Sequence, residues 1–184
     1  MKKIALFLFA LLMSTSFVKA QQQPSVERSI SGVEFGGITL FGYHEMRLSN
    51  SFSLRVEAGL AADLWYHRSF FYESSGFILY PALQIQPRFY YNLNRRSERG
   101  RNISNNAADF LTINTVVIPG WLIASSEENV SQIGSISFVP TWGMRRNIGR
   151  SFEYELGAGI GYGFGFDGSS GWVFRPHLRI GYRF

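Results

Sequence analysis

The sequence contains no cysteine and only three histidines in 184 residues. The absence of cysteine excludes disulfide bonds and attachment of a lipid through a thiol. Three dispersed histidines give no ligand spacing typical of a metal site. Lysine is equally scarce, because only Lys2, Lys3 and Lys19 occur. No apolar run reaches the roughly 20 residues that a membrane-spanning helix needs. We therefore expect no metal, no cofactor and no helical membrane anchor.

The first 20 residues have the three parts of a secretory signal peptide. Two lysines precede an apolar stretch from Ile4 to Met13, and Val18 and Ala20 stand at the positions that a signal peptidase reads. We expect cleavage before Gln21, so that residues 1–20 are a signal peptide and residues 21–184 form one domain. Such a short basic signal is typical of bacterial export. A soluble periplasmic or secreted protein is the plain alternative at this point.

Without residues 1–20, the charge of the chain is almost balanced. The remaining cations are 15 arginines against 13 acidic residues, which gives a net charge of +2. Binding of nucleic acid requires a clustered cationic surface. We therefore expect no nucleic-acid partner.

Apolar and polar residues alternate strictly at the end of the chain. Successive side chains of a strand point to opposite faces, so Ile180, Tyr182 and Phe184 share an apolar face, and Arg179 and Arg183 share a cationic one. The same alternation runs through five further segments, residues 52–66, 77–93, 111–121, 136–144 and 152–166. Six long strands with one apolar face are therefore predicted.

The length of these strands indicates a membrane barrel. Ordinary strands have about 5–6 residues, whereas a transmembrane strand needs about 9–11. The apolar faces carry aromatic residues near their ends, as barrels do at the two membrane interfaces. In lipid, a β-protein can satisfy its backbone only as a closed barrel. We predict an all-β fold, an antiparallel up-and-down transmembrane β-barrel of about eight strands, with apolar faces toward lipid and charged faces toward the lumen.

The number of strands depends on the N-terminal part of the chain. Both chain ends are expected at the periplasmic rim, which requires an even number of strands. Residues 38–48 supply a seventh strand and residues 25–35 an eighth, although alternation in 25–35 is poor. Gly36 and Gly37 would then form the tight turn between them. The alternative is one long strand from Ile30 to Leu48.

The connections fit alternating strand directions. Short turns around Asn50 and Gly149 are expected on the periplasmic side, and longer polar loops at 67–76, 124–132 and 167–171 outside. The exception is the long basic segment from Asn94 to Ala107. It is interpreted as a solvated turn, with contact to an acidic partner or to lipid phosphates as the alternative.

The C-terminal residues RIGYRF resemble the recognition signal of bacterial outer-membrane β-barrels, which end in an aromatic residue. The chain resembles small eight-stranded barrels of the size of the OmpA membrane domain and OmpX. PRFYYNLNRRSERGRNISNNAADF followed by PTWGMRRNIGRSFEYELGAGIGY is similar to a group of uncharacterised outer-membrane barrels. The resemblance implies a location among outer-membrane lipids and recognition of the assembly signal (Ile180, Tyr182 and Phe184) by the barrel-assembly machinery. It implies no activity.

The inward faces predict a network of charges. An eight-stranded barrel is filled by side chains, and buried charges must be paired. The expected members of this structural network are Glu45, Arg47, Arg55, Glu57, Arg88, Arg145, Glu153, Glu155, Arg179 and Arg183. Arg179 and Arg183 are expected across from Glu153 and Glu155, because guanidinium groups fork onto carboxylates. Asp63 and Arg175 also face inward. A proton or ion pathway is the alternative use of this network.

Inward glycines between Gly157 and Gly165 leave space in the upper half of the barrel. That space is either a vestibule or the place where Trp65 and Tyr80 pack, and packing is the favoured interpretation. The predicted role is that of a non-enzymatic outer-membrane barrel with a structural or surface-interaction function and an unidentified ligand. The alternative is a narrow pore or a vestibule for small molecules.

A lipid A-modifying enzyme is also considered. One such type uses a serine and a histidine on its lipid-facing surface, but His44 and Ser49 lie at opposite parity and at the periplasmic rim. His67 and His177 have no obvious serine partner. His44 is therefore interpreted as an interfacial hydrogen-bonding residue.

Overall fold

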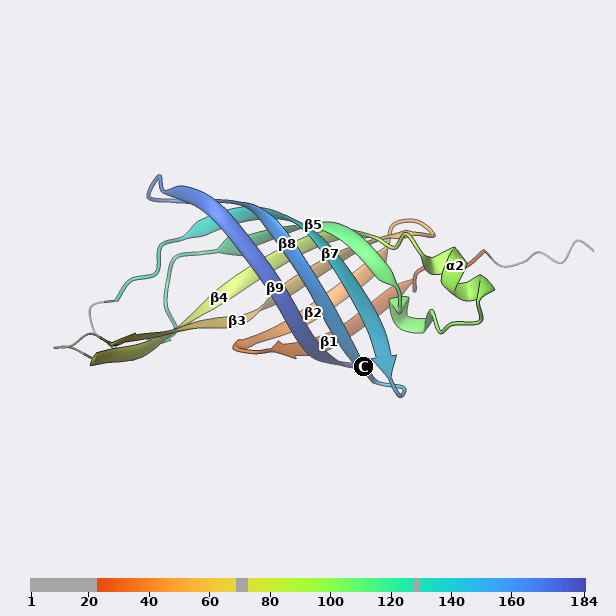
Figure 1. Cartoon of the computed structure of the whole chain (residues 1–184), viewed down its shortest axis with the longest axis horizontal. Coiled ribbons are helices and arrows are strands. Elements are labelled where there is room, and N and C mark those ends of the chain that lie inside the picture. The colour runs from red at the N-terminus through yellow and green to blue at the C-terminus, as the bar shows by residue number, and fades with distance from the viewer. Residues whose placement is uncertain (1–22, 69–72, 128–129) are drawn as a thin grey trace, which may run out of the picture.

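The computed structural model describes residues 23–68, 73–127 and 130–184, and it shows a closed antiparallel β-barrel (Figure 1). Within these residues the wall consists of β1 (Ser29–Gly36), β2 (Thr39–Arg47), β3 (Phe52–Arg68), β4 (Glu73–Phe89), β5 (Asp109–Ile118), β7 (Ser135–Ile148), β8 (Phe152–Gly165) and β9 (Ser170–Arg183). Each strand pairs with its neighbours along the chain, and β1 pairs with β9 to close the barrel. An all-β, eight-stranded antiparallel barrel is thus confirmed. The expected signal peptide lies outside the described residues.

Three short elements were not predicted. A two-residue strand, β6 (Ala124–Ser125), pairs with β4 at Ile78 and Leu79. The basic segment 94–107 contains most of a helix, α2 (Leu93–Glu98), and a 3₁₀ turn, η2 (Ser104–Asn106). No helix in the described ranges is long and apolar enough to cross a membrane.

The two ends of the barrel are distinct. We call the end with α2, the C-terminus and the turns at 48–51 and 149–151 the proximal end (right in Figure 1). The distal end carries the turns at 37–38 and 166–169 and the loop 119–134. β3 and β4 extend farthest at the distal end, where Arg68 pairs with Glu73. The polar loop predicted at 67–76 is therefore mostly strand.

The N-terminal hairpin decides the strand count. β1 and β2 pair from Ser29↔Met46 to Gly36↔Thr39, so the eighth strand exists and the single long strand from Ile30 to Leu48 is wrong. The turn consists of Gly37 and Ile38, one residue later than predicted. Gly37 has φ +62, a left-handed value that glycine adopts without steric cost.

The barrel has an apolar outside and a polar inside. On β8, Leu156 and Ile160 point outward and are exposed, whereas Glu153 and Glu155 point inward and are buried. The same division holds on β3, where Phe52 and Val56 are exposed and Arg55 is buried. The predicted orientation, with the apolar parity outward and the charged parity toward the lumen, is confirmed, and it inverts the arrangement of a soluble protein.

Candidate functional site in the barrel lumen

Ten charged side chains fill the proximal half of the lumen and are buried there. We call them the lumen network: Glu34, Glu45, Glu57, Glu153, Glu155, Arg55, Arg88, Arg145, Arg179 and Arg183. Five carboxylates face five guanidinium groups, so the network has no net charge. Neutrality matters because an unpaired buried charge costs several kcal/mol.

Glu155 and Arg145 are central to the network. Arg88 grips Glu155 with both terminal nitrogens, Nη1 to Oε2 at 2.7 Å and Nη2 to Oε1 at 2.9 Å. Arg145 reaches Glu155 Oε2 at 3.1 Å and Glu45 Oε2 at 2.9 Å. These bonds join β2, β4, β7 and β8 across the lumen. Such two-pronged, charge-assisted bonds fix geometry as well as neutralise charge.

A second group of pairs lies around Arg55. Its Nη2 is 2.6 Å from Glu34 Oε2, and its Nε donates to Glu57. The Arg55 guanidinium also stacks on the ring of Tyr43, 3.7 Å from the centroid. Tyr43 in turn donates its hydroxyl to Glu153 at 2.6 Å. The aromatic ring thereby connects the two groups of charges.

The last strand pairs partly as predicted. Arg183 Nη1 donates to Glu153 Oε2 at 2.6 Å, which confirms that pair. Arg179 lies opposite Glu155 in the β-ladder, but its guanidinium binds Glu57 at 2.9 Å. The expected position of Arg179 across from Glu155 is therefore confirmed, but Arg179 forms its ion pair with Glu57 instead. Long arginine side chains reach past the neighbouring strand, so ladder register alone does not determine their partners.

Arg47 is a further correction. It has the parity of Glu45, yet it is exposed at the end of β2 and does not join the buried network. Parity assigns a face, but the last residue of a strand lies at the rim, where the lumen opens to solvent.

Asp63 and Arg175 lie at the distal side, where Asp63 Oδ2 accepts a hydrogen bond from Tyr80 at 3.0 Å.

Sequence reasoning missed the neutral donors around Glu45. Glu45 Oε1 accepts hydrogen bonds from Ser53, Tyr90 and Asn106 at 2.7–2.8 Å. Asn106 belongs to η2 and has φ +60, a left-handed conformation in which asparagine is enriched. A buried carboxylate with several donors is held charged and immobile, so η2 is attached directly to the network. Glu34 was also missed, because alternation around β1 is poor.

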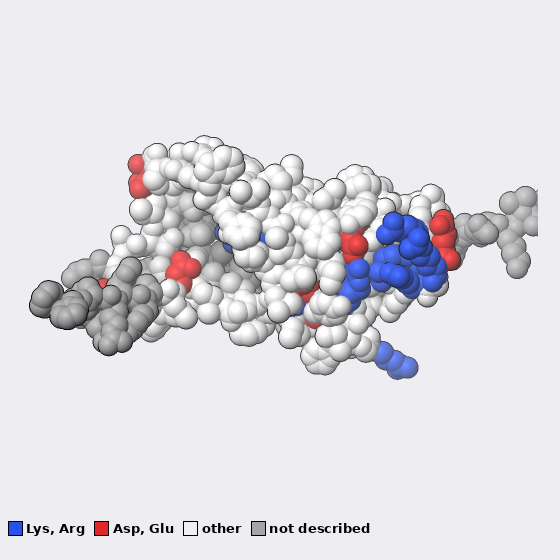
Figure 2. All heavy atoms as spheres, in the orientation of Figure 1, with Lys and Arg blue, Asp and Glu red and all other residues white. Residues whose placement is uncertain are grey.

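The proximal end is closed by apolar side chains beneath the network. Residues before β1, between β4 and β5, and at the start of β5 form one buried cluster: Val26, Tyr90, Leu93, Ala108 and Phe110, with Ile103 packed against it. The basic segment therefore covers the barrel end and is not merely a solvated turn. Arg95, Arg99 and Arg101 remain exposed, and arginines gather at this end in Figure 2. Burial, together with nearby Arg146, lowers the pKa of Arg96.

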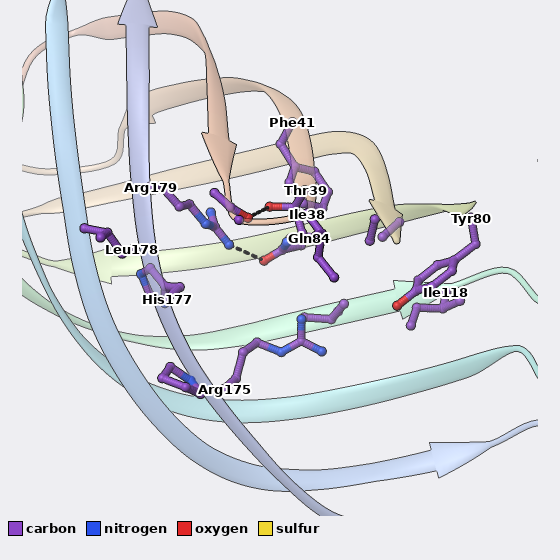
Figure 3. A pocket seen from close by; sticks show the side chains of 16 residues that line it. Ile38, Thr39, Phe41, Tyr80, Gln84, Ile118, Arg175, His177, Leu178 and Arg179 are labelled. Carbon is purple, nitrogen blue, oxygen red and sulfur yellow. Dashed lines mark hydrogen bonds between the residues drawn. The ribbon is translucent and has the colours of Figure 1, made fainter. Parts of the chain in front are cut away.

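The distal half of the lumen contains a cavity of about 470 Å³. Gly36–Thr39 border it from the hairpin, Tyr80 and Gln84 from β4, and Arg175 and His177 from β9 (Figure 3). A second cavity of about 400 Å³ shares Ile118 and Arg175 with the first. Volumes of this size are typical of small-molecule sites. A vestibule thus exists where packing was expected, although Tyr80 itself is buried with Ala61 and Ile78. The structure describes the backbone of Trp65 but not its side chain.

Strand pairing brings a serine to His44 that sequence reasoning missed. Ser31 lies opposite His44, and its Oγ is 2.8 Å from Nδ1. Ser29 Oγ lies 3.5 Å from Nε2 of the same ring. All three side chains are on the outer surface. Both ring nitrogens thus face hydroxyls, and no carboxylate of the described residues is hydrogen-bonded to the ring as a catalytic triad requires.

No protein-family model, no curated protein and no solved structure matches this chain.

Proposed function

We propose that the chain is an integral protein of the bacterial outer membrane, with a structural or surface-interaction role. The observation that carries the proposal is the inverted distribution of side chains. Exposed apolar side chains cover the outside of the barrel wall, and the ten charged side chains of the lumen network are buried inside it. A soluble protein rarely exposes an apolar patch beyond a few hundred Å². An apolar outer surface of this kind is suited to contact with lipid acyl chains.

Aromatic residues near strand ends support this environment. Trp172 is 78% exposed near the distal end of β9, and Phe184 is 82% exposed after its proximal end. Amphipathic aromatic rings favour the interface between acyl chains and head groups. On this proposal, Ile180, Tyr182 and Phe184 form the signal by which the assembly machinery receives the last strand. Outer-membrane lipid is then the surrounding partner.

The lumen network favours a closed barrel over a pore. Arg55, Arg88 and Arg145 are fully buried, and the apolar cluster lies beneath them. Ions would have to break several paired charges to pass. We infer that the barrel does not conduct and that its distal cavity ends blindly at the network. The vestibule, rather than the pore, is therefore the second candidate function.

We propose no catalytic role for the exposed Ser31–His44 pair. A serine nucleophile needs a base held in the right tautomer, usually by a carboxylate. His44 instead lies between two hydroxyls. Expression of the chain should leave the mass of lipid A unchanged. A mass loss that Ser31→Ala abolishes would overturn this part of the proposal.

Conductance in planar bilayers tests the proposed closed state. The mature chain, reconstituted from detergent, should give no regular single-channel steps. The paired change Arg88→Ala with Glu155→Ala removes both charges of one pair together and opens space, so it should raise conductance if the barrel still forms. Regular steps from the unaltered chain, with a pattern that changes in Glu153→Gln, would establish the pore instead.

A further inference from the structure

The barrel wall has a gap on the distal side of the β1–β2 hairpin, which we call the notch. β1 pairs with β9 only from Gly32↔Arg183 to Phe35↔Ile180, and β2 pairs with β3 only as far as Thr39↔Ala61. β9 continues distally to Ser170 and β3 to Arg68. In the described part of the chain, no strand fills the wall between these two extensions. Figure 1 shows the hairpin ending midway while β9 and β3 continue.

The rim of this notch is apolar. On β9, Trp172 and Phe174 point outward and are 78% and 71% exposed. On β3, Leu64 is 66% exposed, and Ile38 at the hairpin tip is exposed as well. The lipid-facing surface thus extends beyond the hairpin tip on both sides. Unpaired strand edges are tolerated at membrane depth only where they line a cavity, so the notch is an opening from the bilayer into the lumen.

The notch leads to the distal cavity. The 470 Å³ cavity is lined by the hairpin tip and by the outward residues Pro176 and Leu178, and also by inward residues such as Ala82. A space bordered by residues of both faces joins the inside of the barrel to its outside. Figure 2 shows a hollow in this face with arginine atoms visible in it.

A cationic side chain lies in this cavity. Arg175 extends into the space in Figure 3, and its Nε is buried without a hydrogen-bond partner. Among the side chains that the structure describes, no carboxylate lies within the 4.0 Å ion-pair distance of its guanidinium, although Asp63 is near enough to interact with it electrostatically. Arg179 is paired in the neutral lumen network, and His177 Nε2 lies 3.4 Å from Glu155. Arg175 therefore has donors to spare for an anion.

We propose that the distal cavity binds an anionic amphiphile that enters from the bilayer through the notch. Its carboxylate or phosphate group accepts hydrogen bonds from Arg175, and its acyl chain passes out over the apolar rim beside Phe174 and Leu64. The apolar walls at Ala61 and Ala82 hold the first part of that chain. The inference rests on the proposed membrane location, because the notch opens only onto the surface assigned to lipid.

The binding test uses Trp172 as a reporter at the rim. The mature chain, with Trp65, Trp121 and Trp142 replaced by Phe, is reconstituted in phosphatidylcholine vesicles at alkaline pH. Quenching is recorded with dibromostearate, with phosphatidic acid carrying dibrominated chains, and with the uncharged methyl ester of dibromostearate. The stearate and phosphatidic acid arms separate a free fatty acid from a phospholipid as the source of the anion. We expect one anionic probe to bind roughly tenfold more tightly than the ester.

Variants locate the site. Arg175→Gln should reduce anion binding to the level of the ester, whereas Arg175→Lys should retain most of the preference. Ala82→Phe should weaken binding of the anion by filling the cavity. Arg150→Gln, which removes an exposed charge from the proximal turn, is the control and should change nothing.

The outcomes separate the two proposals. A chain that does not enter vesicles overturns both the membrane location and the ligand site. A chain that enters vesicles and resists unfolding on unheated gels, but quenches equally with ester and acids, overturns the ligand site alone. The same holds if Arg175→Gln binds the anion as well as the unaltered chain does.

Discussion

The two halves of the lumen are built from the same strands but are filled differently. In the proximal half, ten charged side chains pair so closely that Arg55, Arg88 and Arg145 have no exposed surface. In the distal half, small inward residues such as Ala61 and Ala82 surround a cavity, and the Arg175 Nε buried there has no hydrogen-bond partner among the residues that the structure describes. The difference is that charges are paired where the lumen is filled, whereas Arg175 lies where there is room for a ligand.

The largest expected effect comes from removing the most shared acceptor of the lumen network. Glu45→Ala leaves Arg145 without one of its carboxylates and leaves Tyr90 and Asn106 without an acceptor. Breaking a buried pair on one side costs about 3–5 kcal/mol. Urea unfolding in lipid vesicles should show this loss in the free energy of unfolding. Glu98→Ala, at an exposed site in α2, is the control, and a loss no larger than the control's would contradict the network.

Removing the Tyr43 hydroxyl, which links the two groups of charges, should have a smaller effect on the free energy of unfolding. Tyr43→Phe keeps the ring on Arg55 and removes only the hydroxyl that donates to Glu153. A hydrogen bond to a charged group contributes about 1.5–3 kcal/mol. The free energy of unfolding should fall by this amount, whereas Tyr162→Phe, which loses an exposed bond to Ser170, should stay within about 0.5 kcal/mol.

Two glycines in the distal part of the wall differ in how much space surrounds them. A Cβ at Gly161 would lie 2.0 Å from the carbonyl oxygen of Phe138, whereas a Cβ at Gly171 would meet nothing within 4 Å. Gly161→Ala should therefore destabilise the barrel by about 1–3 kcal/mol, as overpacking does. Gly171→Ala should be neutral or slightly stabilising. Equal thermal stability of the two variants would mean that Gly161 is not needed for the close approach of β8 to β7.

The smallest effect lies in the exposed β8–β9 turn. Hydrogen bonds from the Ser169 hydroxyl and backbone N–H lower the pKa of Asp167. Because the folded pKa is depressed, the stabilisation is present above the unfolded pKa and is lost as the pH falls through the folded pKa. A carboxyl NMR titration in micelles should show the low pKa, and Ser169→Ala should move it back toward the ordinary value. No change on that substitution would contradict the turn geometry.

The sequence predicts the wall of this barrel better than its contents. Alternation identified seven strands and their outward faces, because a strand exposes one parity to each side. The eighth strand, β1, was predicted because a barrel with both chain ends at one rim needs an even number of strands. It did not assign Arg179 to Glu57 or Arg88 to Glu155, since those partners lie on strands that are not neighbours. Side-chain length and the curvature of the closed sheet decide such pairs. The notch escaped prediction for a related reason, because it arises from unequal strand lengths around the ring.

Turn-forming residues predicted the β1–β2 turn, but they did not predict the short helix in the connection between β4 and β5. Glycine at positions 36 and 37 indicated a hairpin, and positive φ at Gly37 bears this out one residue later. The short helix α2 was missed because it has only six residues and five of them are polar or charged. It is held by Leu93 in the proximal cluster. That tertiary contact has no periodic signal in the sequence.

The most direct test of the central claim is whether the chain forms a closed barrel in a membrane-like solvent. The mature chain, refolded into detergent micelles, should have a β-type circular dichroism spectrum and should migrate differently on SDS gels before and after boiling. The account predicts that heat-dependent shift, because the paired wall and lumen network resist SDS until heated. A chain that folds as a soluble monomer without detergent, and migrates identically with and without boiling, would contradict the membrane barrel.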